Sequence, residues 1–380
     1  MRGKRVLLRL DLNVPLLPNG EIGKAESYRL EASLPTLKYL LDKKAKVIIL
    51  THLGRPDGKI VNSLRLDPVA KALGRLLGQQ IMKLDDAFGK ATKLALDELP
   101  SGHVAMLENL RFYPGEEEND IRFARELAKY GDVYVNDAFA VCHRVAASVV
   151  SLAKVLPSYA GLWLEREVKE LTKLLTKPSH PAVAVFGGAK ISTKIKVIEN
   201  IIKKFDVVFL TGGLANTLFL AKGFRTGKSL VEKSELKTAK QLLKSKKVIL
   251  PDDVVVVQSL DRPWEAEVRV ANDIRPRELV VDIGPETIHK IWQAVSTAKM
   301  VLWNGPLGCS EKPSFAKGTD DLVRAIIHSL AYAVAGGGET VEAIRRLKAG
   351  NSFSFLSTGG GAMLEFLSGR ELPGIKTLKR

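Results

Sequence analysis

Basic side chains follow three apolar segments in the first half of the chain. His52 and Arg55 come after VIIL, whereas Arg111 and Arg144 follow apolar runs that end in Asn or Asp. Arg55 precedes a proline, which holds its backbone extended. A guanidinium can fork onto two phosphate or carboxylate oxygens. Together with Arg29, these side chains predict a pocket for a small, multiply charged acid.

Arg29 lies near the start of a helical pattern, which is an unfavourable place for a cation. The positive end of a helix dipole disfavours a cation there by roughly 0.3–1 kcal/mol. An anionic group is therefore expected to compensate. Two alternatives stay open, namely a bound acid or an ion pair with Glu26 or Glu31.

Glycine triplets mark two junctions in the second half of the chain. Residues 336–338 follow an apolar run and precede VEAIRRL, and residues 359–361 precede AMLEFL. Glycine lets a ligand approach the backbone closely, and the free N–H groups and dipole at a helix start attract an anion. Each triplet is a candidate phosphate-binding turn, although a tight strand-to-helix turn alone would also require glycine.

Short β-branched segments alternate with helical patterns along most of the chain. This alternation predicts an α/β protein of two domains, each a parallel sheet covered by helices on both faces, as in Rossmann-like folds. Ligands of such sheets bind beyond the carboxyl ends of the strands, where the basic residues and the glycine triplets fall. The predicted strand segments are KRVLLRLDL, KVIIL, VAMLEN, DVYVNDAF, AVAVFGG, DVVFLTGG, VVVV, MVLWNGP and FSFLSTGG.

The length of the chain also indicates two domains. A single core usually stops growing near ~250–300 residues, and this chain has 380. A helical pattern ending in the breaker run KPSHP indicates a stiff connection rather than a flexible linker. We predict a first domain over 1–156, a connecting helix over 157–177 and a second domain that begins at 178.

Composition narrows the class of protein. The 58 Lys and Arg against 42 Asp and Glu give a net charge of +16, which suits anionic small molecules and would also suit nucleic acid. No RNP-like aromatic motif favours nucleic acid. No apolar run approaches ~18 residues, and the two cysteines offer no metal spacing. The N-terminus lacks a signal-peptide pattern, so we expect a cytoplasmic protein.

A series of ordered segments resembles the motifs of the phosphoglycerate kinases over nearly the whole chain. The resemblance implies a glycolytic kinase that transfers a phosphoryl group reversibly, with Mg²⁺, between 1,3-bisphosphoglycerate and ADP, giving 3-phosphoglycerate and ATP. It also suggests a monomer with small-molecule partners and no membrane or nucleic-acid partner. The segments are LDLNVP, THLGRP, LENLRFYPGEE, VNDAFAVCHR, GGAKISTK, GGLANTLFL, VDIGP, LWNGPLG, AGGGET and STGGGAMLEFL.

The same resemblance implies an N-terminal substrate domain over 1–156, a hinge helix over 157–177, a C-terminal nucleotide domain over 178–360 and a final segment, 361–380, that packs back towards the N-terminal domain.

The resemblance also implies roles for individual residues. The implied substrate contacts are Asp11, Asn13, Arg29, His52, Leu53, Gly54, Arg55, Arg111 and Arg144. The implied nucleotide contacts are Lys194, Gly212, Gly213, Asn304, Glu311, Gly336, Gly337, Gly338 and Glu339, the last of which would also contact Mg²⁺. The residues implied to act on the phosphoryl group during transfer are Arg29, Lys190, Gly337 and Gly360.

This chemistry agrees with the groups that the sequence contains. The attacking carboxylate is ionised near pH 7 because its pKa is around ~3.5–4, so no general base is needed. Positioning and neutralisation of charge are what the reaction requires. Because the two substrates would bind different domains, we expect in-line transfer after hinge closure. Glu339 stands where the family usually has Asp, which leaves the metal geometry open.

Three other functions are less well supported. Residues 223–229, GFRTGKS, are one residue short of a Walker loop and follow a helical pattern. A dinucleotide dehydrogenase would need GxGxxG after a strand, which is missing from the sequence. A nucleic-acid-binding protein stays open on charge alone. It would be recognised by a steep salt dependence of its DNA or RNA affinity, in place of saturable MgADP binding.

Overall fold

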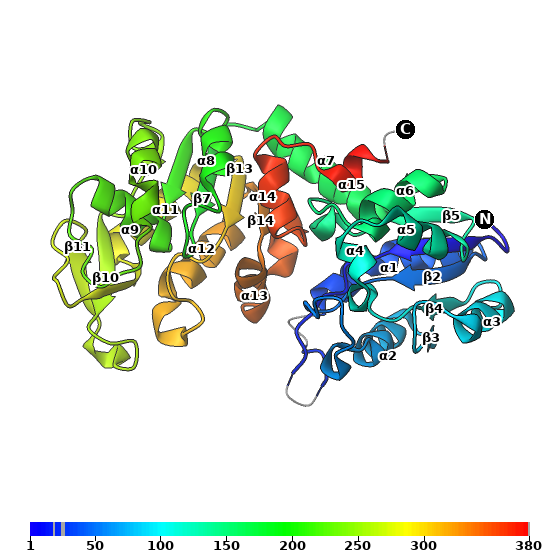
Figure 1. The fold of residues 1–380 in the computed structure, drawn as a ribbon. Coiled ribbons are helices and arrows are strands. Elements are labelled where there is room, and N and C mark those ends of the chain that lie inside the picture. The colour runs from blue at the N-terminus through cyan, green and yellow to red at the C-terminus, as the bar shows by residue number, and fades with distance from the viewer. Residues whose placement is uncertain (18–19, 24–26, 379–380) are drawn as a thin grey trace. The chain divides into compact units, whose positions relative to one another are not determined.

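The computed structural model describes residues 1–17, 20–23 and 27–378. The chain forms two compact units, one of Met1–Lys169 with Glu371–Arg380 and one of Glu170–Arg370. Each unit has its own six-stranded sheet with helices around it (Figure 1). The division between the units falls within the helix α7 (Leu162–Thr176). The predicted α/β fold class with two parallel sheets is confirmed.

The first sheet is parallel throughout. Its strands, in spatial order, are β3 (Ile81–Lys83), β4 (Val104–Met106), β2 (Lys46–Leu50), β1 (Arg5–Arg9), β5 (Val133–Asn136) and β6 (Ser158–Ala160). The helices wholly within this unit are α1 (Tyr28–Asp42), α2 (Asp67–Leu77), α3 (Lys90–Glu98), α4 (Pro114–Glu117), α5 (Ile121–Ala128), α6 (Leu152–Val155) and α15 (Pro373–Lys376).

Both faces of the first sheet are buried. Successive residues of a strand point to opposite faces. Val6 and Leu8 join the core against α1 and α2, whereas Leu7 joins the core against α3, α5 and α6. Because helices cover both faces, these strands read as unbroken apolar runs in the sequence.

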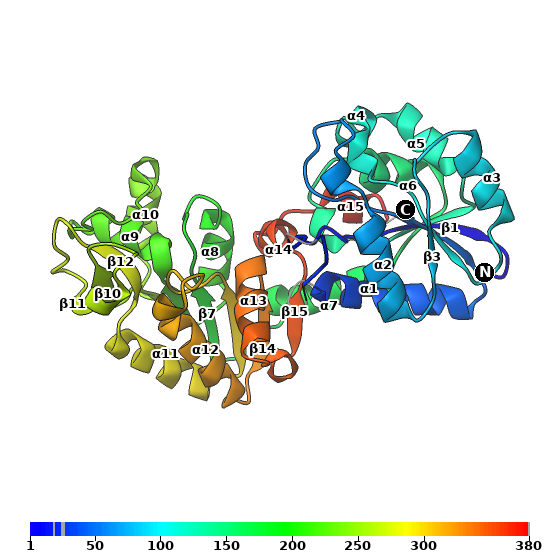
Figure 2. The ribbon, with the colours of Figure 1, turned by 90° about the horizontal axis from the view of Figure 1, so that it is seen from below.

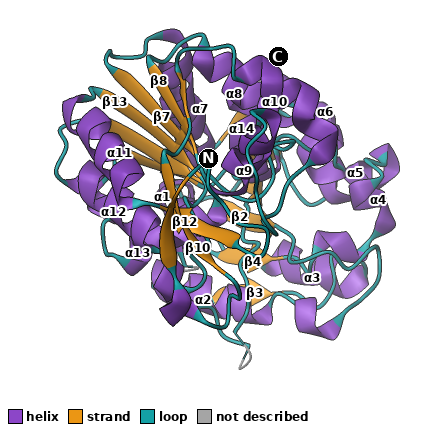
Figure 3. Ribbon diagram, turned by 90° about the vertical axis from the view of Figure 1, so that its left-hand side faces the viewer, coloured by secondary structure: helices purple, strands orange, loops and turns teal. Residues whose placement is uncertain are grey.

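The second unit repeats this plan. Its parallel sheet has the order β15 (Phe355–Ser357), β14 (Tyr332–Gly336), β13 (Met300–Asn304), β7 (Ala182–Phe186), β8 (Val207–Leu210) and β9 (Val248–Ile249). Its helices are α8 (Ile195–Ile202), α9 (Gly212–Ala221), α10 (Leu236–Leu242), α11 (Pro285–Thr297), α12 (Lys317–Ile327), α13 (Gly338–Arg346) and α14 (Gly361–Leu367). Figures 2 and 3 show α8 on one side of β7, with α11 and α12 on the other.

The segment VVVV does not belong to a parallel sheet, so the prediction for this segment is wrong. It forms β10 (Asp253–Val257), the centre of an antiparallel sheet with β11 (Glu267–Val270) and β12 (Leu279–Ile283). Val254 and Val256 pack with Phe219 of α9, whereas Val257 packs with Phe315 on the other face. A central antiparallel strand buried on both faces has the same apolar run as a parallel strand, so periodicity cannot separate the two.

Two segments near the predicted domain boundaries can be assigned to a unit. Residues 158–160, which we predicted as the beginning of the hinge, form β6 at the edge of the first sheet. Of the final segment predicted over 361–380, residues 361–370 belong to the second unit. The chain belongs to the first unit from residue 371 onwards, where the amide of Gly374 donates to the carbonyl of Cys142 at 2.9 Å. Residues 379–380 lie outside the described part. No helix in the described part is long and apolar enough to cross a membrane.

Asp137, the residue that follows β5, holds the start of α7 in place. Its Oδ1 atom accepts a hydrogen bond from the amide of Leu164 at 2.8 Å. The position of a Cβ atom on Gly161 would lie 2.3 Å from that oxygen, so glycine is required there. Asp137 is 4% exposed, and burial raises the pKa of its carboxyl group to about 7.

We predict that Asp137→Asn flattens the pH dependence of stability. In an unfolded chain the carboxyl pKa is about 3.9, so between about pH 4 and 7 the folded state holds a proton that the unfolded state has lost. The contribution of this group to stability is therefore full below about pH 4 and is lost as the pH rises through 7. The Asn variant should lack this loss of roughly 1–4 kcal/mol.

The measurement is urea unfolding of the first unit at pH 4.5 and pH 8. Asp132→Asn is the matched control, because the side chain of Asp132 is exposed and accepts a hydrogen bond from the backbone amide of Arg5 at 2.8 Å. Equal pH dependence in Asp137→Asn and the wild type would contradict the prediction.

Candidate active site

In the first unit, predicted substrate residues meet around the loop that follows β2. The amide of Gly54 donates to Oδ1 of Asn13 at 2.9 Å, and Nη1 of Arg111 donates to the carbonyl of Gly54 at 2.7 Å. Leu53 is 2% exposed, and both of its peptide groups bond to the side chain of Asn109. The loop is therefore held by its neighbours on both sides, and Leu53 helps to position it.

Arg29 forms an ion pair with Asp11. This pair supplies the anion that a cation at the start of α1 requires. Of the carboxylates considered from the sequence, Glu31 accepts a hydrogen bond from Ser27 Oγ at 2.5 Å, and Glu26 lies outside the described residues. The guanidinium of Arg29 is about one third exposed, so it can still reach a ligand.

His52 lies in a strongly positive environment. It is 2% exposed. Burial lowers its pKa well below the ordinary value, and the charges of Arg9, Arg111, Arg144 and Arg29 lower it further. The imidazole is thus neutral near pH 7 among four guanidinium groups. Three of these arginines were identified from the sequence. Sequence reasoning missed Arg9 because it looks like the end of an apolar strand. The signal that could have revealed it is the presence of a charged residue at the end of a buried strand.

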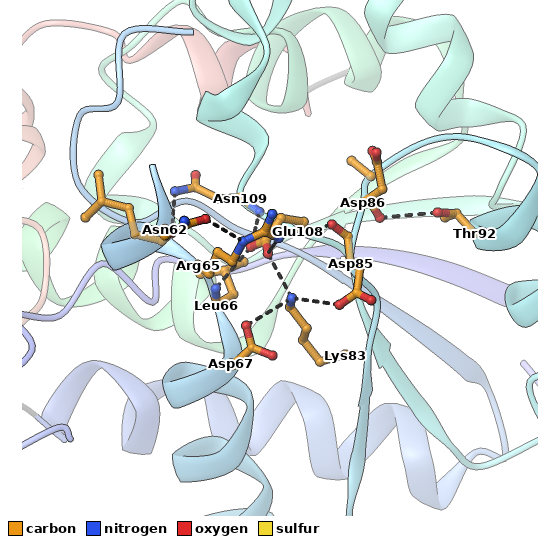
Figure 4. A network of polar contacts seen from close by, with 12 residues as sticks. Asn62, Arg65, Leu66, Asp67, Lys83, Asp85, Asp86, Thr92, Glu108 and Asn109 are labelled. Atoms are coloured by element: carbon orange, nitrogen blue, oxygen red, sulfur yellow. Dashed lines mark hydrogen bonds and ion pairs between the residues drawn. The ribbon is translucent and has the colours of Figure 1, made fainter. Parts of the chain in front are cut away.

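A network behind the loop holds Asn109 in place (Figure 4). Glu108 is 1% exposed and accepts hydrogen bonds from the amides of Leu66 and Asn109. Its carboxylate also pairs with Lys83 at 2.8 Å and Arg65 at 3.0 Å. Asn109 in turn accepts from the amide of Arg111 at 3.1 Å. This buried carboxylate therefore fixes two predicted substrate segments at once, and sequence reasoning gave no role to it.

In the second unit, a cavity of about 260 Å³ opens between the parallel and the antiparallel sheets of that unit. Its wall is mostly apolar and suits an aromatic ring system. Four predicted nucleotide residues lie on this wall, namely Gly212, Gly213, Glu311 and Glu339. Further lining residues are Ala189, Phe219, Val254, Leu260, Leu279, Val281, Pro306 and Leu307.

Glycines allow the turns beside this cavity to pack backbone against backbone. A Cβ atom on Gly187 would lie 1.9 Å from the carbonyl oxygen of Pro306, and one on Gly213 would lie 2.4 Å from that of Ala189. No side chain fits at either position. The turns after β7, β8 and β13 therefore meet at the carboxyl edge of the sheet.

Lys194 links two of these turns. Its side chain is 8% exposed, and Nζ donates to the carbonyls of Gly187 at 2.6 Å and Asn304 at 3.0 Å. Burial lowers the pKa of Lys194 to about 8, and the charge of Glu339 partly opposes this shift. Asn304 Nδ2 donates to the carbonyl of Gly336 at 2.7 Å. The structure thus connects Lys194, Asn304 and the first glycine triplet.

Both glycine triplets lie at strand-to-helix junctions, as the sequence indicated. Gly337 has φ of +104° and precedes α13, and Gly360 has φ of +49° and precedes α14. A Cβ atom on Gly338 or Gly360 would meet nothing within 4 Å, so the backbone is open to a ligand at both turns.

Four predicted residues have exposed side chains, of which Glu311 and Glu339 line the cavity. Lys190 lies on the turn between β7 and α8, and Arg55 lies on the loop after β2. Neither is among the residues that line the cavity in the second unit. Their assigned roles remain predictions from the resemblance.

The described residues contain no group of three or more His, Cys, Asp or Glu side chains that could hold a metal ion. Glu339 is a single carboxylate on the cavity wall. Mg²⁺ in kinases is often held by one or two carboxylates together with substrate phosphates. The donor set fits a metal ion that arrives with a nucleotide.

Comparisons with known proteins identify the family. A family model described as phosphoglycerate kinase matches residues 1–370. The chain is 44% identical over 384 residues to "Phosphoglycerate kinase" of Moorella thermoacetica, covering 100% of this chain and 97% of the relative. The phosphoglycerate kinase structure from Coxiella burnetii superposes with a TM-score of 0.85 at 38% identity, covering 99% of this chain and 96% of that one.

A second solved structure, phosphoglycerate kinase from Pyrococcus horikoshii, has a TM-score of 0.88 at 33% identity and covers 100% of this chain and 96% of its own. Family model, relatives and structures agree over nearly the full length. The chain belongs to the phosphoglycerate kinase family, whose reaction is a glycolytic phosphoryl transfer.

Proposed function

We propose that this enzyme binds 3-phosphoglycerate or 1,3-bisphosphoglycerate on the first unit. The observation that carries the proposal is the convergence of Arg9, Arg29, Arg111 and Arg144 on the buried His52. Both substrates combine phosphate and carboxyl chemistry, which guanidinium groups recognise through paired hydrogen bonds. Asn13 and Gly54 would fix the edge of this pocket, and Arg55 would reach in from the exposed side of the loop.

We propose that ADP or ATP binds on the second unit. The apolar wall of the cavity suits the nucleobase, with Gly212 and Gly213 against one side. The open glycine turn before α13 would receive the phosphates through backbone N–H groups. Lys194 and Asn304 hold this turn, and Glu311 also lines the cavity.

Mg²⁺ would bind together with the nucleotide, with Glu339 as the protein carboxylate. A bound Mg²⁺ neutralises charge on the transferring phosphate group. The carboxylate of Glu339 also interacts electrostatically with Lys194. Glu339 would therefore act on both the bound Mg²⁺ and Lys194, the cation that bridges the turns after β7 and β13.

Transfer would then need the two substrates to meet, since they bind different units. We propose in-line transfer after closure about residues 157–177, with Arg29 and Lys190 neutralising the phosphoryl oxygens and the turns at Gly337 and Gly360 supplying N–H donors. The carboxylate nucleophile requires no general base. Because the reaction is glycolytic, we further propose a cytoplasmic enzyme, and the resemblance to the family suggests a monomer.

The direct test is ATP- and Mg²⁺-dependent phosphorylation of 3-phosphoglycerate by the purified protein, coupled to NADH oxidation. Within that assay, Arg29→Ala should lower kcat by about 10²–10³-fold, because one preorganised cation at the transferring group is lost. Arg122→Ala is the control, since Arg122 is an exposed arginine paired with Asp120. Near-normal turnover of a folded Arg29→Ala protein would contradict the proposal.

Replacement of Glu339 tests the metal position. Glu339→Gln should weaken binding of MgADP at least about tenfold and leave binding of ADP in EDTA nearly unchanged, because the carboxylate contacts the metal rather than the nucleotide. Isothermal titration calorimetry measures both affinities. Glu342→Gln changes an exposed carboxylate on the same helix and should affect neither affinity. Equal loss of both affinities in Glu339→Gln would exclude a metal contact.

Closure can be followed in solution. We expect the radius of gyration from small-angle X-ray scattering to fall when 3-phosphoglycerate and MgADP are both present, and to change less with either alone. Identical scattering from the free protein and from the protein saturated with either substrate or with both would count against closure.

A further inference from the structure

We propose that Arg9, Ser148 and Glu116 are positioning residues that hold His52 in the neutral tautomer with its hydrogen on Nε2. The chemical consequence rests on the proposed binding of 3-phosphoglycerate beside His52. The tautomer itself follows from contacts within the first unit, and it can be measured without any substrate.

The first step is the contact between Arg9 and His52. Nη2 of Arg9 lies 3.0 Å from Nδ1 of His52. A guanidinium has hydrogen-bond donors and no acceptor, so Nδ1 must accept. A neutral imidazole whose Nδ1 accepts carries its hydrogen on Nε2, and a protonated imidazole, which has N–H on both nitrogens, cannot make this contact.

The second step fixes the direction of the bonds behind Arg9. Ser148 Oγ lies 2.5 Å from Oε1 of Glu116 and 2.8 Å from Nε of Arg9. The guanidinium can only donate to Ser148 Oγ, so the hydroxyl hydrogen goes to Glu116. The amide of Ser148 also donates to Glu116 Oε2 at 2.9 Å. Each donor and acceptor from the carboxylate to the imidazole is thereby determined.

The third step is burial. Arg9, Glu116 and His52 are each 2% exposed, and Ser148 is 0% exposed. Nη1 of Arg9 also donates to the backbone carbonyls of Leu10 and Leu50. Water cannot replace these partners, and low local polarity strengthens the bonds between them. The guanidinium is therefore held in one orientation, which a flexible point charge could not achieve.

The consequence is a neutral donor in a cationic site. The charged groups acting on His52 are Arg9, Arg29, Arg111 and Arg144. A fifth positive charge on His52 would be repelled by them. With its hydrogen on Nε2, His52 can donate to an oxygen of the acid substrate and keep the same charge across neutral pH. His52 is then a catalytic residue that touches substrate, and the three residues behind it act through it.

The experiment is a long-range ¹H–¹⁵N NMR spectrum of the free, uniformly ¹⁵N-labelled protein at pH 7. His52→Gln identifies the His52 signals by their loss. We expect the pattern of an unprotonated Nδ1 and a protonated Nε2, unchanged between pH 6 and 8. A protonated Nδ1 at pH 7 would overturn the proposal. A wild type with the expected pattern that does not bind 3-phosphoglycerate would overturn the proposed substrate site instead.

We call the chain of hydrogen bonds from Glu116 through Ser148 and Arg9 to His52 the relay. Ser148→Ala tests whether this relay positions His52. We expect a mixture of tautomers at His52 and a KM for 3-phosphoglycerate raised about three- to tenfold, with the KM for ATP unchanged. Ser151→Ala is matched to it, because Ser151 lies in the same short helical segment, is 3% exposed and donates from its Oγ to Asn119 rather than to Glu116. If both variants behave alike, the relay does not position His52.

Arg9→Lys supplies a second test that does not depend on the folding of Ser148→Ala. Lysine keeps the positive charge and loses the fork that joins Ser148 to His52. We expect the same mixed tautomers and the same rise in the KM for 3-phosphoglycerate. A wild-type spectrum and KM for Arg9→Lys would mean that the charge alone acts, and would overturn the assigned geometry.

Discussion

The carboxyl edge of the sheet in the first unit, where we propose that the acid substrate binds, depends on the burial of a single guanidinium, that of Arg9. A buried charge is costly unless it is hydrogen-bonded and its charge is compensated. Arg9 bonds to two backbone carbonyls, a serine and a histidine, and Glu116 supplies the compensating charge through Ser148. Arg9 itself ends β1, and beyond the adjacent Leu10 its partners come from β2 and the loop after it, from α4 and from the segment Ala147–Ser151. One electrostatic requirement thus aligns four segments that are distant in sequence.

The second unit relies on a steric constraint instead. Its turns approach so closely that Gly187 and Gly213 have no room for a Cβ atom. Lys194 bridges the carbonyls of Gly187 and Asn304. Hydrogen bonds from a buried ammonium group, rather than packed side chains, therefore hold these turns together. The two units reach the same result, a rigid carboxyl edge with open polar groups, by different physical means.

The sequence predicts the parallel sheets and the positions of most candidate site residues at strand ends, because these features are local. A buried parallel strand is an apolar run, and the residues just after it lie at the carboxyl edge. Features that depend on tertiary pairing could not be predicted. The run at β10 does not reveal its antiparallel partners, and Arg9 looks like the end of a strand until His52 is placed beside it. Glu108 shows its role only when Lys83 and Asn109 are brought to it.

The small antiparallel sheet has a consequence for how this enzyme can change over evolution. β10 and β12 form one wall of the cavity proposed to bind the nucleotide, whereas the glycine turns and Glu339 belong to the parallel sheet and its helices. Substitutions in the antiparallel sheet can therefore reshape the apolar wall and leave the glycine turns intact. Selection for a different base and selection for turnover can then proceed through separate sets of residues.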